Sequence, residues 1–500
     1  MSSSSSRSMR SLFLFITYIA LSLTFQAISS QIPAITAQIP AETEPESIKL
    51  HLLHRHGREL RGNPTNGAPP SKLDDLRELL HHDQLRKQMI HSALRGRSRG
   101  GVGAAMSISS GAFAGTGQYF VKFRAGTPPQ NLLLVADTGS DLTWMNCRFR
   151  PKTRVFSPRI NGTRVFRASS SSSFSPLLCS APSCPTLPFS LTACPTASTP
   201  CRYDYRYVDG SFARGFFANE SVTLSAVKPN GRHDGNVRLR HLLIGCSDAF
   251  QGRSFKEADG VLGLGQSAVS FAVQLSRRFD GKFSYCLVDH LAPKNHTSFL
   301  IFGNAPGANR SLSPKEFRRT PLILDQALQP FYGVKVRGIS LDGKLVEIPD
   351  SVWMMNLTAQ SGGVILDSGT TLTALVEPAY EAVLTAFKEK LTGVRRVELS
   401  PFDFCFNSSS SERGNSSEVE REREIVIPKM VWHLGGGVRF EPRGESYVID
   451  VAKGVKCLGI QGAAWPGFST IGNIMQQSFY WEFDLKNGML GFGRSSCSTS

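Results

Sequence analysis

A short motif that occurs twice limits what this chain can fold into. Residues 135–140 read Val-Ala-Asp-Thr-Gly-Ser, and residues 365–370 read Ile-Leu-Asp-Ser-Gly-Thr. In each copy an apolar pair that favours a buried strand precedes the aspartate, while a small hydroxyl residue and a glycine follow it and permit a tight turn against another backbone. Each copy therefore places one carboxylate at the junction of a strand and a turn, and the two copies can bring Asp137 and Asp367 together.

A second repeated element follows each motif. Residues 261–263 read Val-Leu-Gly after the first copy, and residues 470–472 read Thr-Ile-Gly after the second. Asp-Thr-Gly alone occurs by chance in many proteins, but both elements in both halves of one chain are a rare coincidence. We therefore treat the two aspartates as a functional pair.

Two adjacent carboxyl groups can hydrolyse a peptide bond without a metal or a covalent nucleophile. The carboxylate removes a proton from water, and the carboxylic acid polarises the carbonyl. Like charges a few Å apart do not both ionise easily, so the pair holds one shared proton across an acidic range. Asp137 and Asp367 are the predicted catalytic residues, and neither a cofactor nor a metal is expected.

Neighbours of the two aspartates are predicted to support them. Thr138 and Ser368 are placed to hydrogen-bond across the junction and hold the two loops, while Ser140 and Thr370 are placed to bond the outer carboxylate oxygens. The alternative role for each hydroxyl is ordinary capping of its own turn. The full predicted supporting set is Thr138, Gly139, Ser140, Ser368, Gly369 and Thr370.

The amino terminus has the pattern of a secretory signal peptide over residues 1–30. Arg7 and Arg10 precede a largely apolar run at 12–23 that gives way to small and polar residues. No later stretch reaches the roughly 20 apolar residues that span a bilayer, and the hydrophilic end at 495–500 argues against a GPI-anchor signal. The sequence predicts a soluble protein of the secretory route without a membrane anchor, extracellular or in a cell wall, with the vacuole as the alternative.

Residues 31–106 differ from the rest of the chain and are predicted to form a basic pro-segment. Spacing compatible with helices occurs at 48–61 and 71–94, and the Gly/Ser-rich tract 96–117 is an accessible linker for cleavage. The segment would neutralise acidic residues of a cleft until its histidines gain charge below about pH 6.5. A disordered tail is the alternative. The histidines are His51, His54, His56, His81, His82 and His91.

The 10 cysteines indicate disulfides, because the count is even and the chain is predicted to be exported. Short loops suggest the pairs Cys179 with Cys184 and Cys194 with Cys201, and the second half offers Cys405 with Cys457. No spacing matches a zinc module. Glycosylation sequons are also present, at Asn161, Asn219, Asn295, Asn309, Asn356, Asn407 and Asn415.

Short runs of β-branched and aromatic residues alternate with turn residues after the pro-segment, which predicts a mostly β fold. The best helix covers 378–391, and a shorter one follows Ser267. Two low-complexity stretches, 169–173 and 408–424, are predicted to be exposed loops. The predicted strands are 119–124, 131–136, 222–227, 331–340 and 364–366.

Taken together, these motifs resemble the pepsin-like aspartic proteases, and within them the cysteine-rich, nepenthesin-like branch found in plants. The resemblance covers roughly residues 115–497 and implies a bilobal fold with the active-site cleft between two β lobes. Residues 107–315 would form the first lobe, with Asp137, and residues 316–500 the second, with Asp367. The segments that carry the resemblance are 137–144, 207–211, 244–246, 259–265, 283–287, 367–371 and 471–473.

By the same resemblance, Tyr207 is the tyrosine of a flap that closes over bound peptide, and Trp144 is its hydrogen-bonding neighbour in the cleft wall. Core packing is the alternative role for both. The chain departs from the family at Val208, where glycine is usual, and in the cysteine cluster after the first motif, which is reduced to Cys147. The family's disulfide assignments therefore do not transfer to this region.

The sequence disfavours three other classes of function. Residues 263–268 fit a G-x-G-x-x-A dinucleotide pattern but lack a βαβ context. No G-x-S-x-G elbow indicates a serine nucleophile. The scattered basic residues do not alternate with aromatic ones as in a nucleic-acid groove, although the net charge of +16 favours attraction to an acidic polymer such as pectin.

The sequence therefore predicts a monomeric, secreted aspartic endopeptidase, made as a zymogen, whose partners are polypeptide substrates and its own pro-segment. One alternative is a catalytically silent relative that binds or inhibits another protein. Such proteins typically lose a catalytic triplet, whereas both triplets are intact here. The other alternative is a carbohydrate-binding wall glycoprotein, which leaves the paired aspartate motifs unexplained.

Overall fold

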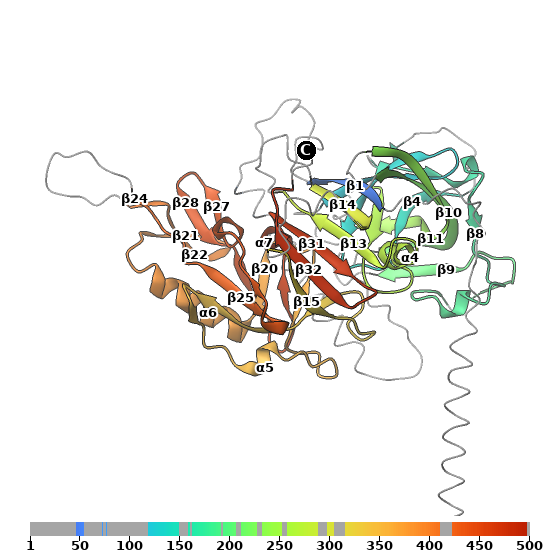
Figure 1. Ribbon diagram of the computed structural model, residues 1–500. Helices are drawn as coiled ribbons and strands as arrows, with labels where there is room; N and C mark the ends of the chain where they lie inside the picture. Colours follow the sequence, from blue (N-terminus) through green and yellow to red (C-terminus); the bar gives the residue numbers. More distant parts are fainter. Residues whose placement is uncertain are drawn as a thin grey trace, which may run out of the picture. The chain divides into compact units, whose positions relative to one another are not determined.

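Strands make up most of the regular structure (Figure 1). The computed structural model describes residues 47–54, 73, 77, 119–149, 159–160, 163–191, 194–206, 212–227, 233–252, 258–288, 298–304, 316–410 and 423–497. From Pro45 onward the chain forms one compact unit. The predicted signal peptide lies outside the described residues, and none of the helices in the described part is long and apolar enough to cross a membrane.

Asp137 is carried by a buried strand of the first half. Strand β2 (Tyr119–Ala125) pairs antiparallel with β3 (Gln130–Asp137), and β12 (Gly260–Gly263) runs parallel to β3 on its other side. The last six residues of β3 are all buried, as expected for an apolar strand covered on both faces. The predicted strands 119–124 and 131–136 are confirmed.

The second half repeats this arrangement. Strand β19 (Val364–Leu366), which leads into Asp367, pairs antiparallel with β16 (Tyr332–Val334) and parallel with β30 (Ser469–Ile471). Both repeated elements of the sequence, 261–263 and 470–472, therefore lie beside the strand that leads to an aspartate. The repeat seen in the sequence is a repeat in three dimensions.

A sheet joins the two halves of the chain. Strand β13 (Lys282–Cys286) pairs with β14 (Ser298–Gly303) on one side and with β31 (Phe479–Asp484) on the other. Strand β31 pairs with β32 (Met489–Arg494), and β32 with β15 (Arg318–Ile323), as Figure 1 shows near its centre. Strands β31 and β32, near the end of the chain, therefore belong to the same sheet as strands β13 and β14 of the first half.

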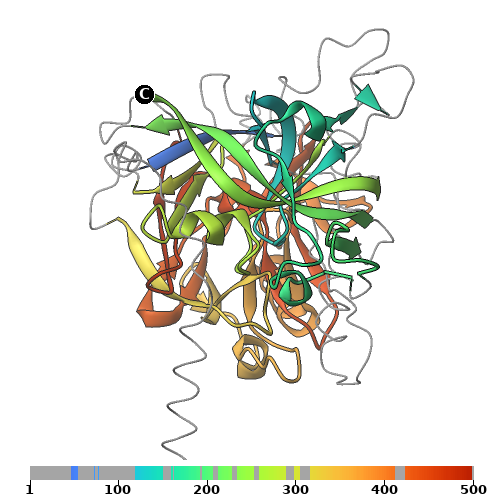
Figure 2. The same ribbon diagram turned by 90° about the vertical axis from the view of Figure 1, so that its right-hand side faces the viewer.

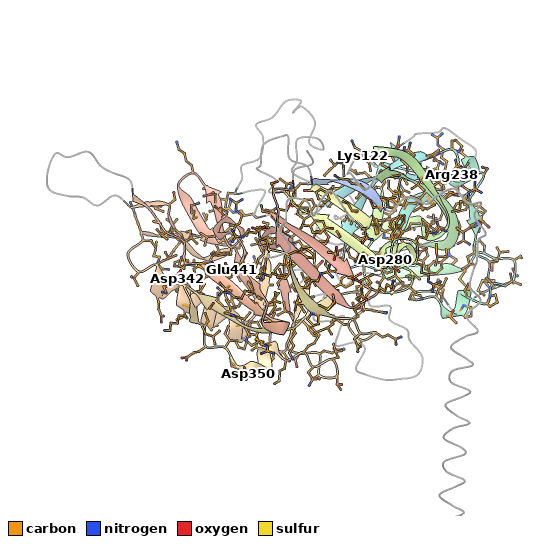
Figure 3. All side chains as sticks on the ribbon, in the orientation of Figure 1. Lys122, Arg238, Asp280, Asp342, Asp350 and Glu441 are labelled. Carbon is orange, nitrogen blue, oxygen red and sulfur yellow. A yellow bond between two sulfur atoms is a disulfide. The ribbon has the colours of Figure 1, made fainter. Side chains whose placement is uncertain are left out.

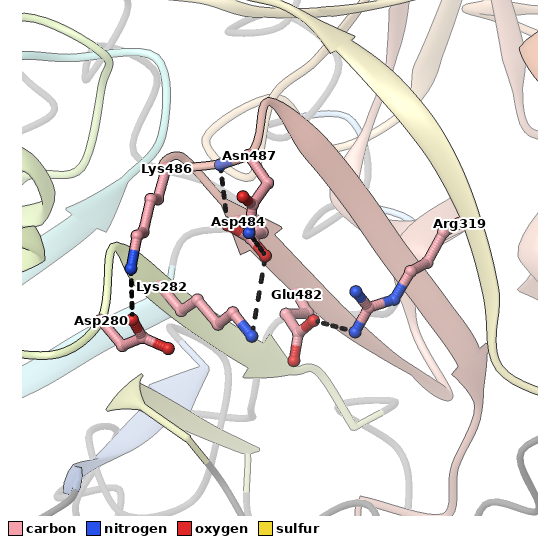
Figure 4. Close-up of polar contacts among 7 residues, drawn as sticks. All are labelled: Asp280, Lys282, Arg319, Glu482, Asp484, Lys486 and Asn487. Atoms are coloured by element: carbon pink, nitrogen blue, oxygen red, sulfur yellow. Dashed lines mark hydrogen bonds and ion pairs between the residues drawn. The ribbon is translucent and has the colours of Figure 1, made fainter.

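Two buried carboxylates on β31 are paired with cations from both flanking parts of this sheet (Figure 4). Arg319 Nη2 lies 3.0 Å from Glu482 Oε1, and Lys282 Nζ lies 3.6 Å from Asp484 Oδ2. Asp484 also accepts hydrogen bonds from the backbone and side-chain nitrogens of Asn487, at 3.0 and 2.8 Å. Burial raises the pKa of Glu482, and the two cations oppose that shift.

Helix α6 (Glu377–Lys390) confirms the predicted helix at 378–391, and α4 (Phe271–Ser276) confirms the shorter one after Ser267. The Ser270 hydroxyl caps α4 by accepting a hydrogen bond from Val273 N at 3.1 Å. Helix α6 buries one apolar stripe, as the helical spacing of its apolar residues in the sequence predicts. Its buried residues are Ala379, Tyr380, Val383, Leu384 and Phe387.

Two predicted strands have different bounds in the structure. The run 222–227 is the end of β10 (Phe212–Val227), which pairs with β11 (His233–Gln251); both are green in Figure 2. The run 331–340 is divided into β16 and β17 (Val336–Leu341), because these strands join different partners, β19 and β25 (Met430–Leu434). An apolar run does not reveal where a strand changes its partner.

The predicted helix at 48–61 is wrong where the structure describes it, because residues Ser47–His54 form strand β1. Apolar and polar residues alternate along this stretch, a period of two that fits a strand. Strand β1 pairs with β14 on one side and with β10 and β2 on the other. Of the second predicted helix, 71–94, only Leu73 and Arg77 are described, and both are helical.

All 10 cysteines form disulfides. The predicted Cys405–Cys457 pair is confirmed, but the two predicted short loops are wrong. Backbone hydrogen bonds from Cys179 N to Thr199 O and from Cys201 N to Leu177 O fold this region back on itself. Each disulfide of the region therefore links a cysteine of its first part to a cysteine of its second part. The other four pairs are Cys147–Cys246, Cys179–Cys194, Cys184–Cys201 and Cys286–Cys497.

The predicted exposed loop at 169–173 is wrong in part, since Ser171 is buried and its hydroxyl accepts a hydrogen bond from Thr127 N at 2.9 Å. Most of 408–424 lies outside the described residues. The remaining elements are β4 (Trp144–Arg148), β5 (Arg159–Ile160), β6 (Thr163–Arg164), β7 (Phe166–Arg167), η1 (Ala168–Ser170), β8 (Ser175–Pro176), η2 (Cys184–Thr186), β9 (Arg202–Arg206), β18 (Lys344–Leu345), α5 (Asp350–Trp353), β20 (Thr373–Val376), β21 (Arg396–Leu399), β22 (Phe402–Asn407), β23 (Ser409–Ser410), β24 (Arg423–Glu424), η4 (Gly435–Gly437), β26 (Arg439–Phe440), η5 (Gly444–Ser446), β27 (Val448–Ala452), β28 (Val455–Leu458), β29 (Ile460–Ala463) and α7 (Asn473–Gln476).

Candidate active site

Asp137 is the last residue of β3 and is fully buried. Its Oδ1 accepts a hydrogen bond from Gly139 N at 3.0 Å. Its backbone carbonyl accepts one from Leu264 N at 2.9 Å, just beyond β12. The carboxylate is therefore held by its own turn, and the turn is held by the neighbouring parallel strand.

Asp367 directly follows β19 and is also fully buried. Its Oδ1 accepts a hydrogen bond from Gly369 N at 3.0 Å, and its Oδ2 accepts one from Thr370 Oγ1 at 2.6 Å. Its backbone N donates to Ile471 O at 3.2 Å, on the parallel strand β30. The two aspartates thus have the same strand setting and the same contact with the glycine two residues later.

The two turns meet through the residues that follow the aspartates. Ser368 N donates to Thr138 Oγ1 at 2.9 Å, while Thr138 N and Thr138 Oγ1 each lie 3.2 Å from Ser368 Oγ. These contacts match the cross-junction hydrogen bonds expected from the sequence. Because Thr138 and Ser368 are buried and adjacent in sequence to the aspartates, they fix the two carboxylate-bearing turns against each other.

Two glycines let the parallel strands approach these turns. A Cβ at Gly263 would lie 2.3 Å from the carbonyl oxygen of Asp141, and one at Gly472 would lie 2.5 Å from that of Leu372. Such distances exclude any side chain unless the backbone moves. The second repeated element of the sequence therefore ends in glycine because the backbone of the aspartate turn occupies the place of a Cβ.

Two threonines complete this support, and sequence reasoning gave them no role. Thr143 Oγ1 accepts a hydrogen bond from Gly263 N at 3.1 Å, and Thr373 Oγ1 accepts one from Gly472 N at 3.2 Å. Each threonine stands six positions after its aspartate, so a comparison of the two copies extended past the motif would have found the pair.

The hydroxyls of Ser140 and Thr370 differ in their contacts. Thr370 bonds a carboxylate oxygen of Asp367, as expected. The Ser140 hydroxyl instead lies 3.5 Å from the backbone carbonyl oxygen of Asp137, which is a weak contact. In this conformation the expectation that Ser140 bonds the carboxylate of Asp137 is wrong.

A tyrosine that sequence reasoning did not single out lies close to Asp367. Tyr285 is buried on β13 and donates a hydrogen bond to Gln476 Oε1 at 2.5 Å. Burial, and then the charge of Asp367, raise the pKa of this phenol well above its ordinary value. Tyr285 therefore stays neutral at any working pH and contributes a dipole rather than a charge.

The structure describes only one of the two residues predicted to contact substrate. Tyr207 lies outside the described residues. Trp144 begins β4 and is fully buried in an apolar cluster that also contains Tyr203 and Phe217. Its ring lies 5.7 Å from that of Phe250. Trp144 therefore packs in the wall of the first half, and its predicted role beside Tyr207 stays a prediction.

The described residues contain one group of side chains close enough to hold a metal ion together. The sulfurs of Cys179, Cys184 and Cys194 lie within 4.8 Å of one another. Each of these sulfurs is bonded in a disulfide, and a metal prefers the thiolate form. The arrangement at the aspartates suits a different chemistry, in which two carboxyl groups share a water and exchange its protons.

Comparisons with known sequences point to one group of proteins. Family models described as "Xylanase inhibitor N-terminal" and "Xylanase inhibitor C-terminal" match residues 119–304 and 331–494. "Aspartyl protease family protein 2" of Arabidopsis thaliana is 34% identical over 399 residues, covering 79% of this chain and 74% of that protein. "Aspartic proteinase nepenthesin-1" of Nepenthes gracilis is 30% identical over 459 residues, covering 90% of this chain and 93% of that protein.

Solved structures share the fold. The crystal structure of edgp superposes with a TM-score of 0.61 at 19% identity, covering 91% of this chain and 96% of that one. Conglutin gamma, a basic 7S globulin from lupine seeds, gives a TM-score of 0.59 at 18% identity, covering 77% and 95%. These likenesses confirm the mostly β, bilobal pepsin-like fold expected from the sequence.

Proposed function

The chain belongs to the nepenthesin-like branch of the pepsin-like aspartic proteases, and we propose that it is an active endopeptidase whose catalytic residues are Asp137 and Asp367. The observation that carries this proposal is the hydrogen-bonded contact of Thr138 with Ser368. This contact holds the two turns that bear the buried carboxylates against each other. Hydrolysis of a peptide by an aspartate pair needs two carboxyl groups held near each other.

In the proposed reaction a water molecule lies between the two carboxyl groups. The ionised group accepts a proton from this water while the protonated group donates a hydrogen bond to the carbonyl oxygen of the substrate. The water oxygen attacks the carbonyl carbon, and the second proton transfer goes to the departing amine. Gly139, Gly369 and Thr370 orient the carboxylate oxygens in this scheme.

The zymogen and the secretory route are part of the proposal. Residues 1–30 would be a signal peptide and 31–106 a pro-segment, and the mature protein would act outside the cell, in a cell wall or in the vacuole. Strand β1 indicates that the proposed pro-segment is part of a sheet of the folded protein, because β1 lies between β14 on one side and β10 and β2 on the other. Its removal would open a gap inside a sheet, so maturation should alter the folded state and not merely trim a tail.

The proposal is tested by hydrolysis of an unfolded protein substrate between about pH 2 and 7. The full chain is compared with Asp137→Asn, Asp367→Asn and the control Asp350→Asn, which removes an exposed carboxylate (Figure 3). We expect pepstatin-sensitive activity at acidic pH in the wild type and the control and none in the other two. Activity that survives in Asp137→Asn or Asp367→Asn, or its absence from correctly processed wild-type protein, contradicts the proposal.

A second candidate is a protein that binds or inhibits an enzyme, since the matching family models are described as xylanase inhibitor domains. Both aspartate motifs are intact, and Asp137 and Asp367 each accept a hydrogen bond from the glycine two residues later, which favours the protease. Inhibition of a xylanase by the folded protein, in the absence of peptide hydrolysis at any pH, would decide for the second candidate.

A further inference from the structure

Four cationic side chains, called here the basic face, project from one side of the sheet in the first half. They are two residues apart on each of two strands, and side chains at such spacing point to the same side. Arg124 pairs with Thr223 of β10, and Thr223 pairs with Arg238 of β11, so one row crosses three strands. The basic face consists of Lys122 and Arg124 of β2 and Arg238 and Arg240 of β11. Lys122 and Arg238 are labelled in Figure 3.

None of these four cations forms an ion pair with the residues that the structure describes. The guanidinium of Arg124 donates to a neutral partner, Asn236 Oδ1, at 2.6 Å. Some other surface cations are paired, as Lys456 is with Asp450 at 2.8 Å and Lys486 is with Asp280 at 3.0 Å. The basic face therefore presents uncompensated positive charge.

Two neighbouring positions on this side of the sheet are polar and neutral, while Leu133, opposite Lys122, is apolar and buried. Asn131 lies opposite Arg124 on β3, and Ser225 lies opposite Asn236 at the other end of the row. The large apolar side chains that are exposed lie on other segments: Leu178, Leu191, Leu324, Leu345, Met354 and Val426. The basic face thus offers amides and hydroxyls between its charges, without an aromatic ring for stacking or an apolar group for insertion into a membrane.

We propose that the basic face binds a carboxylated polysaccharide. Arginine forks match the geometry of carboxylates, and the neutral amides and hydroxyls suit sugar hydroxyls. From the geometry of strands, the Cα atoms of Arg124 and Arg238 lie about 10 Å apart and those of Lys122 and Arg124 about 7 Å apart. This spread fits a chain with repeated anionic groups better than a single anion. Proteins that bind single-stranded nucleic acid stack its bases on aromatic rings, and no exposed aromatic ring lies among the described residues of this surface.

Such binding leaves the candidate active site free. Arg124 pairs with Asn131, near the start of β3, whereas Asp137 is the last residue of that strand. Six residues of extended chain separate the two by about 20 Å. The polymer would hold the protein in an acidic matrix while the aspartate turns remain open to other molecules.

The test measures binding of the full chain to immobilised polygalacturonate at low ionic strength, followed by a salt titration. The basic-face variant carries Lys122→Gln, Arg124→Gln, Arg238→Gln and Arg240→Gln. A matched control has the same change in net charge at four exposed cations elsewhere, with Arg337→Gln, Lys344→Gln, Lys388→Gln and Lys453→Gln. Thermal unfolding checks that both variants fold.

We expect the basic-face variant to lose about tenfold or more in affinity and the control to change little, with binding weakened by salt and by methyl esterification of the polymer. Equal losses in both variants would show that net charge alone is responsible and would overturn the proposal, as would no binding at all. Tighter binding to RNA or to anionic vesicles than to polygalacturonate would overturn the assignment to polysaccharide. These readouts do not depend on peptide hydrolysis, so they stand apart from the test of the protease.

Discussion

The substitution Leu50→Ala tests whether β1 belongs to a removable pro-segment. Leu50 is 6% exposed, lies opposite Leu300 of β14 and packs in the main apolar core. Replacing a buried leucine by alanine costs about 2–5 kcal/mol, because it removes buried apolar surface and leaves a cavity. We expect a loss of this size in the full chain, and no effect once residues 31–106 have been removed.

The assay is denaturant or thermal unfolding of the full chain and of the acid-processed protein, each with and without the substitution. Leu345→Ala is the matched control, because Leu345 is 59% exposed and the same substitution there should change stability by less than about 0.5 kcal/mol. An unchanged full chain would refute the packing of β1. An equal loss before and after processing, with β1 still present by mass spectrometry, would refute its place in a removable pro-segment.

Three further predictions concern other parts of the chain. Thr370→Val should lower kcat for peptide hydrolysis by about tenfold or more, and Ser140→Ala much less, because Thr370 alone of the two bonds a carboxylate oxygen; steady-state kinetics across the acidic range checks this, and equal effects would contradict it. Burial raises the pKa of Glu482, so its contribution to stability is present below its unfolded pKa and is lost as pH rises through its folded pKa. The stability of Glu482→Gln relative to wild type should therefore increase from about pH 4 towards neutral in unfolding titrations, and a flat or falling difference would refute this. Replacing Cys286 and Cys497 together by alanine removes a cross-link between residues 211 positions apart and should cost about 5 kcal/mol in unfolding free energy; a loss near zero would contradict it.

The sequence was sufficient for the parts of the fold that local chemistry determines. Apolar pairs before the aspartates marked strands β3 and β19, and the period of the apolar positions at 378–391 marked helix α6. These features depend on residues close together in the chain. The contact of Thr138 with Ser368 was also predictable, because the repeated motif itself implied a partner in the other half.

What the sequence did not reveal depends on long-range geometry. The crossed disulfides of Cys179 and Cys184 follow from a fold-back that no spacing rule encodes. The alternation of apolar and polar residues in β1 covers only eight residues, and its pairing with β14, β10 and β2 stabilises it as a strand. Tertiary contacts override local propensity in such segments.

The two halves of the candidate active site are alike in their backbone and differ in their side chains. Gly139 N and Gly369 N each donate a hydrogen bond to the Oδ1 of the preceding aspartate of their motif, at 3.0 Å. The backbone nitrogens of Gly263 and Gly472 each donate to a threonine hydroxyl. A symmetric frame cannot by itself make one carboxyl the base and the other the acid. The hydroxyl of Thr370 and the neutral phenol of Tyr285 both lie on the side of Asp367. Any division of roles between the two carboxyl groups must therefore arise from side chains such as these, which is why exchanging the hydroxyl at 370 should alter catalysis more than exchanging the one at 140.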